Sequence, residues 1–243
     1  MINRPTGQIP FVTKIVAAAL ICTTAYILLA IVAVPPGQVR EFQFVEEHAA
    51  IGVLSAIILS MGCAFCMATI AVLLLRRERG ILLWVLLTAG FAFLAFDELL
   101  LFHERLGRYA NAMASSGVFR GWDDIIVILY GVIALPFAIA LLPNLLRYRL
   151  VLEFFVIGFL FYVIHTLIDS TQEPQTTTSV ILEESAKLFS VEFLAMGAFF
   201  GFFGKLCAVV AGEANLIKEP NKKESNESDA SAASIPQSSV SRA

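Results

Sequence analysis

The sequence predicts an all-α membrane protein, a polytopic bundle of six transmembrane helices, from three observations. Hydrophobic residues make up 58% of the chain and charged residues only 15%, whereas a soluble domain carries about 25% charged residues. The apolar residues occur in blocks of about 20, which is the length of helix that crosses roughly 30 Å of hydrocarbon. The blocks are continuously apolar rather than alternating, which favours helices over a β-barrel.

Polar or helix-breaking residues bound each expected span. The first span ends at a Pro-Pro-Gly turn, and its length favours an uncleaved helix over a signal peptide. The third is uncharged as far as Phe96, and its helical pattern continues to about Arg108, before a loop from Tyr109 to Gly121. The expected spans cover residues 11–34, 49–75, 81–108, 125–142, 150–168 and 181–211. Residues 1–212 thus form a transmembrane domain, and residues 213–243, rich in Ser, Asn, Glu and Lys, form a disordered cytoplasmic tail.

The distribution of Lys and Arg predicts that both chain ends are cytoplasmic, because positively charged loops stay on that side of a membrane. In an N-in, C-in arrangement the cytoplasmic segments hold twelve of the 17 basic residues: Arg4, Lys14, Arg76, Arg77, Arg79, Arg147, Arg149, Lys205, Lys218, Lys222, Lys223 and Arg242. The outer segments hold only Arg40, Arg105, Arg108, Arg120 and Lys187. The net charge of −3 indicates no nucleic-acid partner, and membrane lipids are the expected surroundings.

The outer ends of the expected helices gather most of the groups that can carry chemistry. They hold all three histidines, His48, His103 and His165, and twelve of the 20 acids: Glu41, Glu46, Glu47, Asp97, Glu98, Glu104, Asp123, Asp124, Asp169, Glu173, Glu183 and Glu184. Helix ends packed in one bundle bring such groups together, so we expect a cluster that joins the third and fifth helices. The alternative is an acidic rim in contact with solvent.

The densest segment runs from Asp97 to Glu104. On a straight helix His103 points about 120° away from Asp97, so both can bind one ligand only through a bend or with a partner helix. Asp97 and Glu98 lie about 24 Å along the helix from Ile81, at the edge of the hydrocarbon. At that depth, Asp97 and Glu98 are not expected to be simply exposed to bulk water.

This Asp-Glu-x4-His-Glu pattern after an apolar helix resembles a segment of uncharacterised bacterial multi-pass membrane proteins. The resemblance covers the residues from Phe96 to Glu104. It implies a protein of the bacterial inner membrane and brings no activity with it.

Two further pairs lie at the same level. Asp169 follows His165 by one helical turn, and a carboxylate at that spacing fixes the tautomer of an imidazole or holds it as a metal ligand. Glu183 and Lys187 share one face of the sixth span, which predicts an ion pair within that helix.

Glu192 is the acid expected deepest in the membrane. It follows Glu183 by nine residues, which places it about 13 Å deeper along the helix. An ionised carboxylate at that depth costs at least about 3 kcal/mol. We therefore expect it to face the bundle interior, either with a polar partner from another helix or as a neutral carboxyl with a raised pKa. The candidate partners are Ser55, Ser60, Thr69 and Tyr130.

The residue types favour a membrane enzyme that depends on a metal and acts on a lipid or small substrate. Imidazoles and carboxylates suit Zn or Fe, and a metal-activated water would attack an ester or amide. The expected ligands are His103, His165, Asp169, Asp97 and His48; the candidate catalytic groups, whose roles stay unassigned, are Glu98, Glu104 and Glu192. Two alternatives stay open: a transporter whose acids conduct protons or cations, and a non-catalytic subunit or sensor whose acidic rim binds a membrane protein partner.

Overall fold

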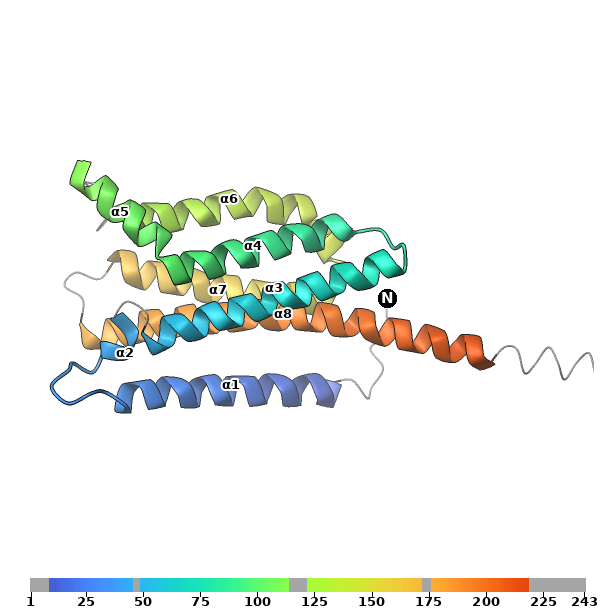
Figure 1. The fold of residues 1–243 in the computed structure, drawn as a ribbon, viewed down its shortest axis with the longest axis horizontal. Coiled ribbons are helices and arrows are strands. Elements are labelled where there is room, and N and C mark those ends of the chain that lie inside the picture. Colours follow the sequence, from blue (N-terminus) through green and yellow to red (C-terminus); the bar gives the residue numbers. More distant parts are fainter. Residues whose placement is uncertain (1–8, 46–48, 114–121, 172–175, 219–243) are drawn as a thin grey trace, which may run out of the picture. The chain divides into compact units, whose positions relative to one another are not determined.

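The computed structural model describes residues 9–45, 49–113, 122–171 and 176–218, and every regular element in these ranges is a helix (Figure 1). Six of these helices are long and apolar enough to cross a membrane. The predicted all-α, six-span fold is therefore confirmed. Which side of the membrane each terminus occupies stays a prediction.

The membrane-spanning helices are α1 (Ile9–Val32), α3 (Ala50–Leu75), α4 (Ile81–Leu100), α6 (Trp122–Leu145), α7 (Arg149–Thr171) and α8 (Thr177–Lys218). Two shorter helices, α2 (Phe42–Val45) and α5 (Phe102–Met113), join them. The chain forms two compact units, residues 1–202 and 203–243. In the second unit α8 continues to Lys218, beyond the predicted start of the tail. The remainder of the tail lies outside the described residues and stays a prediction.

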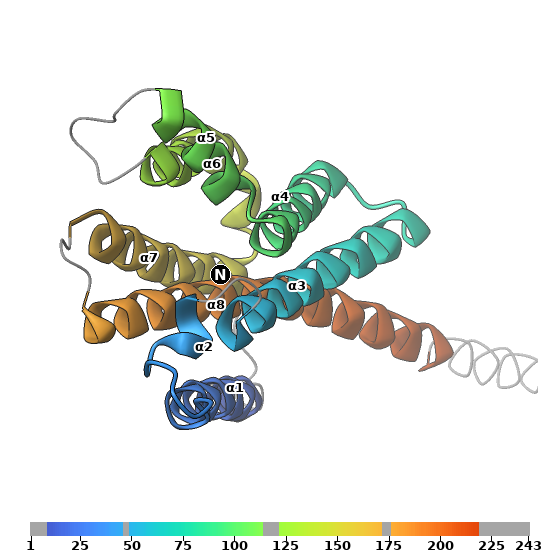
Figure 2. The same cartoon turned by 60° about the vertical axis from the view of Figure 1, so that its left-hand side comes forward.

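The expectation of one helix from Ile81 to Arg108 is wrong. Helix α4 ends at Leu100, and Leu101 adopts the left-handed conformation, with φ 53° and ψ 44°. Helix α5 then starts in a new direction and packs beside α6 (Figure 2). The local sequence conceals this break, because a leucine in the left-handed region is unusual and its neighbours are good helix formers. Helix α5 also includes Tyr109–Met113, which were expected in a loop; residues 114–121 lie outside the described residues.

Of the six membrane-spanning helices, α8 is the most buried, because 39% of the residues in its 18-residue apolar stretch are buried inside the protein. The corresponding stretch of α6, within Ile125–Leu145, contains no buried residue. Close contacts through glycine bring neighbouring helices against α8. A Cβ on Gly201 would clash with the Trp84 ring of α4, and one on Gly197 would lie 2.6 Å from the Phe155 ring of α7. Small residues at such contacts are typical of membrane bundles.

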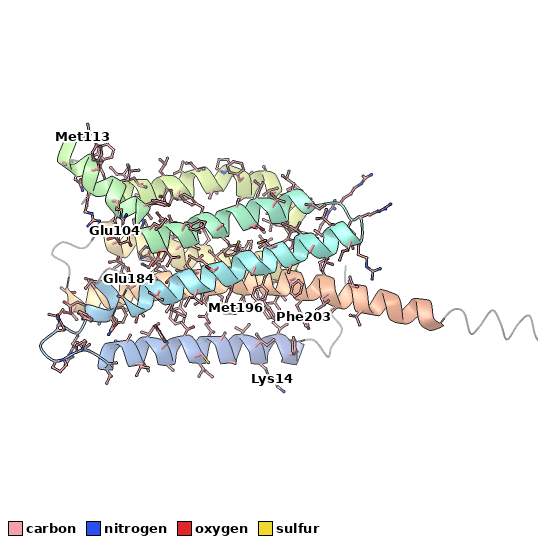
Figure 3. All side chains as sticks on the ribbon, in the orientation of Figure 1. Lys14, Glu104, Met113, Glu184, Met196 and Phe203 are labelled. Carbon is pink, nitrogen blue, oxygen red and sulfur yellow. The ribbon has the colours of Figure 1, made fainter. Side chains whose placement is uncertain are left out.

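The acidic candidate residues apart from Glu192 lie at one end of the helices of the first unit. Figure 3 shows Glu104 and Glu184 at one end of the helices and Lys14 at the other. The basic connection between α3 and α4, residues 76–80, lies at the same end as Lys14 (Figure 1). The candidate functional residues therefore belong to the end at which α4 meets α5.

Candidate functional site

A cavity of about 540 Å³ lies at one end of the first unit, and Glu104 and Glu184, which Figure 3 labels, are among its lining residues. Each helix from α2 to α8 contributes to its walls. Its ionisable lining groups, which define the acidic cavity, are Asp97, Glu98, Glu104, Asp169, Glu183, Glu184, Lys187, Arg108, His103 and His165. Six carboxylates face two cations, so the formal charge is −4 with both imidazoles neutral. Of the candidate site residues that the structure describes, all but Glu192 line this one cavity.

Asp97 and His103 form a pair across the break at Leu101. Nδ1 of His103 lies 2.7 Å from Oδ2 of Asp97, and the backbone N–H of His103 donates to Oδ1 at 3.0 Å. Tyr130 of α6 donates its hydroxyl to the same Oδ1 at 3.4 Å. The buried carboxylate therefore satisfies a free backbone amide in the first turn of α5 and also orients the ring of His103. The break at Leu101 is the bend without which these two side chains could not meet.

The pair changes the acid–base behaviour of His103. Burial alone lowers the pKa of His103, but the hydrogen bond and the charge of Asp97 raise it by more. Lys187 opposes this increase and Glu104 adds to it. The net result is a pKa above the ordinary value of 6.5. The imidazole is therefore more basic than a free histidine, as expected for one held by a carboxylate.

Lys187 joins α8 to α4 through two carboxylates. Its Nζ lies 2.7 Å from Oε2 of Glu184 and 3.0 Å from Oε1 of Glu98. Both carboxylate side chains are only 13% exposed. The ion pair predicted within this helix is present with Glu184, at i,i+3, as the partner of Lys187, and tertiary packing supplies Glu98 as the second acid. The carboxyl of Glu98 also packs against Gly52 of α3, where a Cβ would lie 3.4 Å from Oε1.

His165 of α7 is the second imidazole of the cavity, and it is 92% buried, with a relative exposure of 8%. Its ring hydrogen-bonds the backbone of Glu183 in α8. Its Nδ1 atom is buried and has no hydrogen-bond partner among the described residues.

The predicted metal site finds no support in this geometry. Among the described residues, no three His, Cys, Asp or Glu side chains come close enough together to hold a metal ion. Asp97 is committed to His103, while His165 bonds a backbone group. His48, a predicted ligand, lies outside the described residues. Asp169 lines the cavity, as expected from its position one turn after His165.

Glu192 is buried, with 5% exposure, as expected of an acid that faces the bundle interior. Its partner, however, is Thr23 of α1, and the expectation of Ser55, Ser60, Thr69 or Tyr130 is wrong. Two of the proposed hydroxyls bond carbonyl groups of their own helices, and the Tyr130 hydroxyl bonds Asp97. Glu192 does not line the acidic cavity, so it is separate from the chemistry at that site.

Sequence reasoning missed the roles of Lys187 and Tyr130 in this site. Lys187 was considered only within its own helix, and Tyr130 only as a partner of Glu192. One signal was available: a lone lysine inside a membrane span must find an acid. Glu98 lies at the same depth on another helix and was therefore a reasonable partner. No comparable signal in the sequence pointed from Tyr130 to Asp97.

Comparison with known proteins places the cavity inside a family. The model of the family DUF8692, described as a domain of unknown function, matches residues 13–200. That match spans every residue that lines the acidic cavity. No curated protein and no solved structure matches the chain. Because the family model covers most of the sequence, this chain belongs to the DUF8692 family.

Proposed function

We propose that this protein is a membrane-embedded enzyme in which Asp97 and His103 act as a general acid–base pair. One observation carries the proposal: a buried carboxylate holds Nδ1 of an imidazole at 2.7 Å in the wall of a cavity of about 540 Å³. A cavity of that volume lies within the usual range of small-molecule sites, about 300–1,000 Å³.

The geometry assigns a role to each member of the pair. Nδ1–H of His103 donates a hydrogen bond to the Asp97 carboxylate, which leaves Nε2 as the atom that accepts a proton from the substrate. Nε2 removes a proton from a bound water or hydroxyl as that oxygen attacks an ester or amide carbon. The imidazolium then returns this proton to the leaving group, while the carboxylate stabilises the positive charge. Tyr130 keeps Asp97 in place through its bond to Oδ1.

Helix α5 supports a substrate that arrives from the membrane. Phe102, Leu106, Tyr109 and Met113 recur at helical spacing, and all four are exposed, from 44% for Phe102 to 74% for Met113. A short helix with one apolar and one charged face lies in the headgroup layer of a bilayer. His103 is on this helix, so its ring is at the depth of lipid ester and amide bonds.

The metal-dependent form of this function stays a separate prediction. Zn or Fe would supply an activated water, with ligands from the histidines and acids predicted above. Metal analysis of protein purified without a chelator tests it directly. A stoichiometric metal that is lost in the His103→Ala or His165→Ala variant would support it, and a metal-free active protein would contradict it.

The test of the acid–base pair compares variants on a panel of lipid esters and amides. Asp97→Asn preserves shape but favours the wrong tautomer of His103, and we expect turnover to fall by about 10³–10⁴-fold. His103→Gln should fall as far. The control Glu153→Gln changes an exposed residue of α7 outside the cavity, and it should retain full activity.

The pH profile gives a second readout. The free base of His103 is the active form, so activity should rise with pH through the raised pKa and be lost on the acid side. Asp97→Asn removes the hydrogen-bonded charge that contributes most to raising the pKa of His103, while burial continues to lower it, so the acid limb should move to lower pH. Histidine NMR measures the same titration without a substrate. A His103 that titrates at or below 6.5 in wild-type protein, with turnover indifferent to Asp97→Asn, would refute the proposal.

A further inference from the structure

We propose that the inner end of the acidic cavity binds a hydrocarbon chain, so that the substrate is a lipid held by its tail. This substrate class rests on the proposed enzyme function, which supplies the reaction at the polar end of the lipid. The inner end is the part of the cavity that lies deepest among the membrane-spanning helices. It is lined by Leu94 of α4, Tyr162 of α7, and Ser190, Val191 and Leu194 of α8.

Helix geometry places the inner end deeper than the charged groups of the cavity. Oε1 of Glu98 lies 3.0 Å from Nζ of Lys187, so these two residues mark a common level on α4 and α8. Leu94 precedes Glu98 by four residues, which is about 6 Å further into the bundle. Leu194 follows Lys187 by seven residues, which is about 10 Å further in. The lining therefore changes from charged to uncharged within about two helical turns.

The polar groups of the inner end are already bonded within the protein. Ser190 donates its hydroxyl to the backbone oxygen of Gly158 at 2.9 Å, and Tyr162 donates its hydroxyl to that of Val127 at 2.6 Å. Neither hydroxyl has a hydrogen left to donate to a ligand. A polar group that entered this end would lose its hydrogen bonds to water without full replacement, whereas an aliphatic chain has none to lose. The inner end therefore favours an apolar occupant.

The inner end has accessible apolar walls with tight packing behind them. Leu94, Tyr162 and Leu194 are half-buried and line the cavity, so each retains surface that a ligand can contact. Behind them α7 packs closely against α8, because a Cβ on Gly158 would lie only 2.9 Å from Cγ of Leu194. An apolar space of this kind is poorly hydrated and binds apolar molecules. In a membrane, the apolar groups at this depth are the hydrocarbon chains of lipids.

The outer end of the cavity gives the chain a direction. Asp97 and His103 form their pair there, and Leu94 precedes Asp97 on α4 by three residues, or about 4.5 Å. A chain that occupies the inner end therefore presents its ester or amide bond to the ring of His103. The head of the lipid then lies at the level of α5, in the headgroup layer. A ligand with both parts is an amphiphile, and a small polar molecule would leave the inner end unfilled.

Photolabelling maps the path of the chain in the wild-type protein. Protein in nanodiscs would receive an uncharged monoacylglycerol that carries a diazirine either at the far end of its chain or beside its ester, and mass spectrometry would identify the labelled residues. We expect the far-end diazirine to label Leu94 and Leu194, and the diazirine beside the ester to label Asp97 and Glu184. Excess monoacylglycerol without a diazirine should suppress this labelling and leave that of Leu182, which is exposed on α8, unchanged.

Filling variants test whether the chain occupies the inner end. Leu194→Trp places a larger ring there. A buried methylene contributes roughly fourfold to affinity, so a ring that displaces two or more methylenes should reduce the labelling of Leu94 by at least about 10-fold. Leu182→Trp makes the same change at a residue of α8 that is 55% exposed and does not line the cavity, and it should be labelled as wild type is.

A second pair of variants fills the same space from α4, in case Leu194→Trp does not fold. Leu94→Trp should reduce the labelling of Leu194 by at least about 10-fold for the same reason. Leu82→Trp is its control, because Leu82 is 63% exposed on α4 and does not line the cavity.

A second probe identifies the lipid that supplies the chain. It is phosphatidylethanolamine with a diazirine at the far end of one chain. Labelling of Leu94 and Leu194 by the monoacylglycerol alone would assign a lipid with a single chain, and the same labelling by phosphatidylethanolamine would assign one chain of a membrane phospholipid. The proposal is overturned if neither probe labels these residues, or if each filling variant is labelled as its control is.

His103→Gln keeps the chain site and the catalytic proposal apart. This variant should lose turnover and still show the wild-type labelling of Leu94 and Leu194. Wild-type labelling together with full turnover would remove only the catalytic proposal. Turnover that depends on His103 in a protein whose inner end is never labelled would remove only the chain site.

Discussion

Replacing Lys187 with methionine removes the ammonium that lies between two carboxylates. In the wild-type protein its Nζ is 3.0 Å from Glu98 and 2.7 Å from Glu184, and both carboxylate side chains are 13% exposed. Water therefore gives these carboxylates little screening once the ammonium is gone. Removing one partner of a buried ion pair costs about 3–5 kcal/mol, and we expect the unfolding free energy to fall by that amount.

The assay is reversible unfolding in mixed micelles, in which SDS is titrated and helicity is followed by circular dichroism. Arg149→Met provides a matched control, because Arg149 pairs with Glu153 at 2.9 Å while the two side chains are 83% and 42% exposed. Such a solvent-exposed pair is worth about 0–1 kcal/mol. The two variants therefore remove the same kind of contact in different environments.

A compensating variant tests the electrostatic cause. Lys187→Met combined with Glu98→Gln and Glu184→Gln removes the buried carboxylates together with the ammonium, and it should recover most of the lost stability. If Lys187→Met unfolds like Arg149→Met, the buried ion pair does not hold α4 to α8. If the triple variant is no more stable than Lys187→Met, the cost arises from packing rather than from unpaired charge.

Three further predictions concern other parts of the fold. Glu192→Gln keeps the hydrogen bond with Thr23, so its unfolding free energy in the SDS assay should stay within about 1 kcal/mol of wild type. Glu192→Ala leaves the buried hydroxyl of Thr23 without its partner and should lower the unfolding free energy by about 1–3 kcal/mol. Equal losses in the two variants would contradict the hydrogen bond. Gly62→Ala places a Cβ 2.7 Å from the Phe91 ring and should lower the unfolding free energy by about 1–3 kcal/mol. Gly90→Ala is its control, because no atom lies within 4 Å of the added Cβ, and it should be neutral or stabilising. A neutral Gly62→Ala would show that the ring moves aside. Alkaline phosphatase fused to the C-terminus should be inactive and a cytoplasmic reporter active, as the excess of basic residues predicts; the reverse result would overturn the N-in, C-in topology.

The sequence predicted the depth at which the candidate site residues lie, but it did not predict which of them bond to one another. Counting along each helix placed Asp97, His103 and His165 at the same depth, and the structure gathers them around one cavity. The bond between Asp97 and His103 depends on the left-handed Leu101. No glycine or proline in the sequence indicates a helix break there. The sequence could therefore predict the contact between Asp97 and His103 only if the helix bends between them.

The sequence by itself determined the number of spans and the depth of each polar group. Apolar blocks of about 20 residues admit only helices in lipid, and a fixed rise of 1.5 Å per residue turns sequence position into depth. Tertiary structure decided which helices are neighbours and how each is rotated, and so it paired Lys187 with Glu98 and Glu192 with Thr23. The physical reason is that lipid and the bundle interior are equally apolar. A membrane helix therefore has no marked hydrophobic face to reveal its neighbours, and contacts between helices depend on close packing and on a few polar groups.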